Sequence, residues 1–112
     1  MTSTIIASFE KLLDGPRDGA LLRYALGNEY LKAGHGEQAA AHLRAAIERD
    51  ATLSAAWKLL GKALDASGQH AEALSAFERG IVVAEAQGDR QAAKEMTIFA
   101  RRLRRQMADT GG

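Results

Sequence analysis

Three histidines are the residues of this sequence best suited to acid–base chemistry or metal binding. His35 and His70 fall in two expected helix–helix turns, and His42 falls on the helix between them. No two histidines have the His-x-x-x-His spacing that places metal ligands on one helix face. The acidic residues are scattered, and no cysteine is present to supply a thiolate or a disulfide. We therefore predict no catalytic residue, no cofactor and no metal site.

Four arginines near the end of the chain, Arg101, Arg102, Arg104 and Arg105, form a second candidate site. They could contact phosphate groups or an acidic protein. They could also face solvent and stabilise the negative end of a helix dipole, which we favour because no aromatic residue is interleaved with them to stack on bases. The first 100 residues carry a net charge of −2, and the last 12 carry +3. We therefore expect no nucleic-acid partner.

We predict no segment that would direct the chain to a membrane. No apolar run approaches the roughly 20 residues that span a bilayer. Residues 1–9 lack the basic start and long apolar stretch of a signal peptide. We expect a cytoplasmic protein.

Apolar residues recur at helical spacing along the chain, and no segment reads as a strand. Gly15 with Pro16 would end the first helix, and Gly88 would end the fifth. Asp18 and Asp89 would cap the helices that follow them. The predicted helices cover about 3–14, 18–33, 37–49, 54–67, 70–86 and 90–107, with 108–112 as a frayed tail.

A shift of 34 residues lays residues 20–53 on residues 54–87. Three of the four coinciding residues are small or mark turns, where two antiparallel helices need them, so their positions indicate a repeated helix pair. Gly27 and Gly61 have no Cβ, which would let the partner helix approach closely. The four identities are Gly27 on Gly61, Gly34 on Gly68, Ala39 on Ala73 and Ile47 on Ile81.

The second repeat resembles the tetratricopeptide repeat (TPR) family, and the first matches it less fully, with Arg23 in place of the leading aromatic. The residues that carry the resemblance are Trp57, Leu60, Gly61, Leu64, Ala73, Phe77 and Gly80. The resemblance implies a small bacterial-type TPR protein: an all-α superhelix of antiparallel helix pairs that binds another protein and is not an enzyme. We expect one domain, 1–112, with about six helices. Its parts are a half-repeat helix (1–17), repeats 20–53 and 54–87, a C-terminal capping helix (88–108) and a flexible tail (109–112).

The resemblance also implies where a partner would bind, because the first helix of each pair lines a concave face in this family. A groove there would take an extended peptide or a partner helix. The lysines among the predicted contact residues, Lys32, Lys58 and Lys62, could hold the carboxylate of an acidic peptide. Alternatively, all of the predicted contact residues could form an ordinary solvent-exposed face. The clamp with which some TPR domains hold chaperone C-termini is absent, because Tyr24 stands where its lysine should be. The predicted peptide-binding residues are Tyr24, Asn28, Lys32, Lys58, Lys62 and Asp65.

A structural role is the alternative. The sixth helix could mediate self-association, giving a homodimer or an assembly scaffold. A nucleic-acid binder acting through the C-terminal arginines ranks below both. The apolar residues of that helix are Met96, Phe99, Leu103 and Met107.

Overall fold

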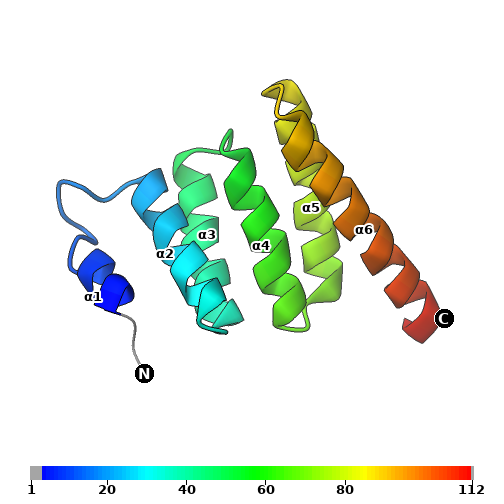
Figure 1. Ribbon diagram of the computed structural model, residues 1–112, viewed down its shortest axis with the longest axis horizontal. Coiled ribbons are helices and arrows are strands. Elements are labelled where there is room, and N and C mark those ends of the chain that lie inside the picture. Colours follow the sequence, from blue (N-terminus) through cyan, green and yellow to red (C-terminus); the bar gives the residue numbers. More distant parts are fainter. Residues whose placement is uncertain (1–3, 112) are drawn as a thin grey trace.

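The computed structural model describes residues 4–111, and every regular element in this range is an α-helix (Figure 1). This confirms the predicted all-α class and the helix pairs. The helices are α1 (Thr4–Glu10), α2 (Ala20–Lys32), α3 (Gly36–Arg49), α4 (Ser54–Ala66), α5 (His70–Ala86) and α6 (Arg90–Gly111).

The helices stand side by side in two layers. Each of α2 to α6 packs against its neighbours in sequence, and α4 also contacts both α2 and α6. One layer therefore holds α2, α4 and α6, and the other holds α3 and α5 (Figure 1). The extents of 45 × 34 × 19 Å fit this arrangement, because two helix layers are about 20 Å thick. Helix α1 lies at the N-terminal end, against α2.

Glycines end three of the helices, in the left-handed conformation that favours this residue. Their φ angles are 83° at Gly34, 80° at Gly68 and 74° at Gly88. The predicted cap at Asp89 is confirmed, because its Oδ1 accepts the backbone N–H of Ala92 at 3.1 Å.

The connection between α1 and α2 differs from the prediction in two ways. The left-handed residue is Asp14, with a φ of 64°, and not Gly15. Asp18 does not cap α2, because its carboxylate accepts two hydrogen bonds from Arg23, at 2.9 and 2.7 Å, and one from the Asp14 amide at 2.9 Å. A bidentate arginine pair is a stronger partner than a helix amide.

Two helices also differ in length from the prediction. Helix α1 ends at Glu10, and Ile6 is its buried residue, so little packing sustains further turns. Helix α6 continues to Gly111 through most of the predicted tail, with the Thr110 hydroxyl donating to the carbonyl of Gln106 at 2.9 Å. Gly112 lies outside the described residues.

The two matching glycines lie at the helix crossings. A Cβ on Gly27 would lie 2.5 Å from Cγ of Leu43, and a Cβ on Gly61 would lie 2.5 Å from Cδ1 of Phe77. The predicted close approach is therefore present in both repeats. The side chain that faces the glycine is Leu43 in the first repeat and Phe77 in the second.

Helix α6 joins the repeats through the same kind of contact. Met96 is fully buried, and its Sδ would lie 2.5 Å from a Cβ on Gly80 of α5. The core of the domain thus runs from α2 to α6 without interruption. Its largest fully buried side chains are Leu26, Leu43, Leu64, Phe77 and Met96.

Candidate functional site

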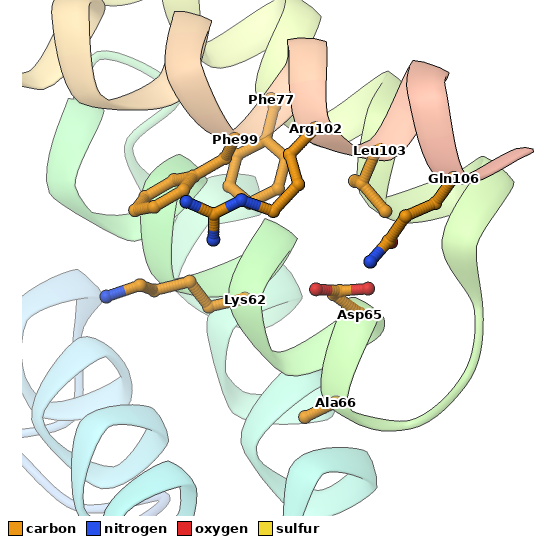
Figure 2. Close-up of a pocket in the computed structure, with 8 residues that line it drawn as sticks. All are labelled: Lys62, Asp65, Ala66, Phe77, Phe99, Arg102, Leu103 and Gln106. Carbon is orange, nitrogen blue, oxygen red and sulfur yellow. The ribbon is translucent and has the colours of Figure 1, made fainter.

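A groove lies between α4 and α6 in the layer shared with α2, and we call it the α4–α6 groove (Figure 2). Its volume is about 190 Å³. Phe77 and Leu103 are buried and supply an apolar floor, while Lys62 and Arg102 are exposed at the rim. The complete lining is Lys62, Asp65, Ala66, Phe77, Phe99, Arg102, Leu103 and Gln106.

Two cations share one aromatic ring at this groove. The Nζ of Lys62 lies 5.3 Å from the ring centroid of Phe99, and the Cζ of Arg102 lies 6.0 Å from the same centroid. The face of an aromatic ring attracts cations at such distances. The Phe99 ring also packs against Phe77, with 5.4 Å between their centroids. The two cationic side chains therefore lie against an aromatic ring that is itself packed on the buried Phe77.

Asp65 lies beside these cations and has a partner of its own. Its Oδ1 is 2.8 Å from Nδ1 of His70, the first residue of α5. The groove thus combines two cations and one carboxylate above apolar side chains.

The six predicted site residues separate into two groups. Lys62 and Asp65 line the α4–α6 groove. The other four are not part of its lining: Tyr24, Asn28 and Lys32 belong to α2, and Lys58 belongs to α4. Tyr24 is half-buried and packs against the hydrophobic core.

Two of the predicted lysines already hold carboxylates. Lys58 donates to Glu95 of α6 at 2.9 Å, and this hydrogen bond holds the pKa of Glu95 below its usual value. Lys32 donates to Glu29 of the same helix at 3.2 Å. Lys58 therefore ties α4 to α6.

Phe99, Arg102 and Gln106 of α6 line the groove but are absent from the predicted peptide-binding set. The reason is that Phe99 was assigned to a self-association surface, Arg102 to the arginine cluster and Gln106 to no site. Their spacing of three and then four residues places them on one face of a helix, which the sequence alone could have revealed.

Three of the C-terminal arginines, Arg101, Arg102 and Arg105, line one shallow pocket together with Ile98, and Arg104 lies apart from them. Arg104 pairs with Glu78 of α5 at 2.7 Å, and Arg102 lies over Phe99. Arg101 and Arg105 are exposed. Within the described residues, only Arg104 has an ion-pair partner among these four, and the solvent-facing role that we favoured for the cluster stays a prediction.

The histidines have ordinary structural contacts. The ring of His42 stacks on Tyr30, with 5.4 Å between centroids, and burial lowers the pKa of His42. The Tyr30 hydroxyl donates to Glu10 at 2.5 Å, which raises the pKa of Tyr30 and ties α1 to α2. Within residues 4–111, no group of three or more His, Cys, Asp or Glu side chains is placed to hold a metal ion.

The apolar face of α6 is largely used within the chain. Met96 and Leu103 are buried, and Phe99 and Met107 are half-buried. A self-association surface made of these four residues is therefore not available as predicted, and homodimer formation stays a prediction. No helix in the described range is both long enough and apolar enough to cross a bilayer.

Comparisons with known proteins identify the family. The chain is 50% identical over 101 residues to a TPR repeat-containing protein of Pseudomonas aeruginosa, covering 90% of this chain and 96% of that protein. The solution structure of a Bordetella parapertussis protein superposes with a TM-score of 0.84 and 40% identity, covering 98% of this chain and 96% of that one. The solution structure of a tetratricopeptide repeat domain protein from Salinibacter ruber gives 0.70 and 26%, covering 80% of this chain and 90% of that one. No protein-family model matches the chain. The bacterial relative that matches over nearly its whole length and the stacked helix pairs agree: the chain belongs to the tetratricopeptide repeat family, as a small bacterial-type member, and is in general terms a protein–protein interaction module.

Proposed function

We propose that the chain binds an extended segment of a partner protein on its α2–α4–α6 layer, with the α4–α6 groove as the main contact. The observation that carries this proposal is the make-up of the groove, with an apolar floor of Phe77 and Leu103 below a rim that holds Lys62 and Arg102. Aromatic and arginine side chains around a desolvated pocket are typical of the residues that dominate binding energy at protein interfaces.

The size of the groove favours a peptide over a small molecule. Ligand sites for small molecules usually measure about 300–1,000 Å³. A volume of about 190 Å³ fits one or two side chains. The rest of an extended segment would continue towards α2, where Tyr24, Asn28 and Lys32 remain our proposed contacts. That the chain has no enzymatic activity, and that it is cytoplasmic, stay predictions.

The test uses peptides selected from a random display library on the purified chain. Each enriched peptide is titrated into the ¹⁵N-labelled protein, and amide chemical shifts are mapped by NMR. We expect the largest shifts around Lys62, Phe99 and Arg102. Shifts confined to α3 and α5, or a library that yields no binding peptide, would contradict the proposal.

Adjacent residues of α6 supply the matched variants. Phe99→Ala removes the aromatic wall of the groove and should weaken binding about tenfold, since an interface anchor contributes about 1–2 kcal/mol or more. Ile98→Ala removes a side chain of similar hydrophobicity that is 46% exposed and outside the groove lining, and should leave binding unchanged. Circular dichroism establishes that both variants keep the helical fold.

A further inference from the structure

The two cations over Phe99 form no ion pair of their own within residues 4–111, because the nearby carboxylates of Glu95 and Asp65 are hydrogen-bonded to Lys58 and His70. In the described residues, no carboxylate lies within ion-pair distance of Lys62 or Arg102. Lys58, one turn before Lys62, has Glu95, and Arg104 has Glu78. The fold thus pairs the basic side chains next to the groove, while Lys62 and Arg102 inside it form no ion pair with any described residue, because Asp65 of the same lining is paired with His70.

An anion would relieve the repulsion between these cations. Two like charges at one ring raise each other's energy. A carboxylate placed between them would accept charge-assisted hydrogen bonds from both. The floor of Phe77 and Leu103 lies beside them, so a neighbouring apolar side chain of the same ligand could be buried in the same step (Figure 2).

The charge of the groove selects the kind of anion. Its lining holds Lys62, Arg102 and Asp65, which gives a net charge of +1. One carboxylate neutralises this charge. A phosphate monoester carries up to two negative charges, and its excess charge would face Asp65.

We propose that the α4–α6 groove recognises a peptide segment in which a Glu or Asp stands next to a leucine-like side chain. The carboxylate binds Lys62 and Arg102, and the apolar side chain packs on Phe99 and the groove floor. This inference rests on the proposed function and assigns the chemistry of the partner at that same site.

The experiment measures fluorescence anisotropy with four labelled octapeptide pools. Their flanks are random mixtures of Gly, Ala, Ser and Thr, and their central pairs are Glu-Leu, Gln-Leu, Glu-Ser and phosphoserine-Leu. We expect the Glu-Leu pool to bind at least about tenfold tighter than each of the others, because hydrogen bonds to charged groups are worth about 1.5–3 kcal/mol.

Matched substitutions separate a specific site from general attraction. Arg102→Gln should weaken binding of the Glu-Leu pool about tenfold. Arg101→Gln removes the same charge from the adjacent exposed position, outside the groove lining, and should change binding less than about twofold. Lys62→Gln and Lys94→Gln form a second pair with the same expectation. All four side chains are exposed, so the fold should tolerate each change.

The outcomes distinguish this inference from the proposed function. Equal binding of the Gln-Leu pool, with shifts still mapping to the groove, would overturn the acidic specificity and keep peptide binding. Tighter binding of the phosphoserine pool would overturn it in favour of a phosphorylated partner. Equal losses from Arg101→Gln and Arg102→Gln would show that only net charge matters, which also refutes the site. If no pool and no library peptide binds, both proposals fail.

Discussion

Replacing Gly61 with alanine tests the close crossing of α4 and α5. The new Cβ would lie 2.5 Å from Cδ1 of Phe77, where carbon atoms prefer roughly 3.5–4.0 Å. The ring or the helix must therefore move by about 1 Å. Such overpacking costs about 1–3 kcal/mol, while alanine gains about 1 kcal/mol over glycine inside a helix. Phe77 is only 2% exposed and is held by Phe99, so we expect the overpacking cost to dominate.

The expected net effect is a loss of about 1 kcal/mol in the free energy of unfolding, or roughly 5 °C in Tm. Urea unfolding followed by far-UV circular dichroism and by Trp57 fluorescence measures it. Ser75→Ala is the control, because it raises helix propensity at an exposed position of α5 and should stabilise the chain by a few tenths of a kcal/mol.

A double-mutant cycle locates the cause. Phe77→Val removes the ring atoms that face Gly61, so adding Gly61→Ala to that variant should be neutral or stabilising. The coupling energy should be about 1–3 kcal/mol. A Gly61→Ala variant that gains about 1 kcal/mol by itself would show that the crossing has room for a methyl group, and the reasoning about close approach would be refuted.

Three further predictions concern the N-terminal half. The hydrogen bonds from Arg23 and from the backbone hold the pKa of Asp18 below its ordinary value of 3.8, so the stability that Asp18 provides above that pH is lost as the pH falls. Asp18→Asn should therefore flatten the fall in the free energy of unfolding measured with urea between about pH 5 and pH 2. An unchanged slope would contradict this. Burial lowers the pKa of His42 below 6.5, so protonation favours the unfolded chain as the pH drops through 6.5. An NMR titration of the imidazole should give His42 a pKa under 6.5. A higher value would refute the buried environment of this side chain. Tyr30→Phe removes the hydrogen bond to Glu10 and should speed amide hydrogen exchange in α1 about fivefold, while α4 and α5 stay protected. Exchange in α1 at the rate of the unchanged protein would show that packing alone holds this helix in place.

The repeat could be predicted from the sequence because its main requirements belong to single residues. Gly34 and Gly68 adopt positive φ angles that other residues rarely take, so turns at those positions follow from residue type alone. Gly61 could be assigned to a helix crossing from its residue type as well, since only glycine lacks the Cβ that would clash with the Phe77 ring.

The contacts that the sequence did not reveal depend on how helices are rotated and which partner is nearer. Asp18 has the residue type of a helix cap, yet it binds Arg23, which offers a bidentate pair. Lys58 and Glu95 lie 37 residues apart, and their pairing is fixed only when α6 settles against α4. The α4–α6 groove itself exists only between two such helices. Local chemistry therefore predicted the elements and the crossings but only part of the binding face.

The packing of each helix only on near neighbours has a consequence for how the chain folds. Within the described residues, every packed pair of helices is adjacent in the chain or separated by one helix. The native topology can then form by closing short loops, which is typical of domains that fold in microseconds to milliseconds. Folding can start in either hairpin and spread outward, and fraying should begin at α1, which touches the array least.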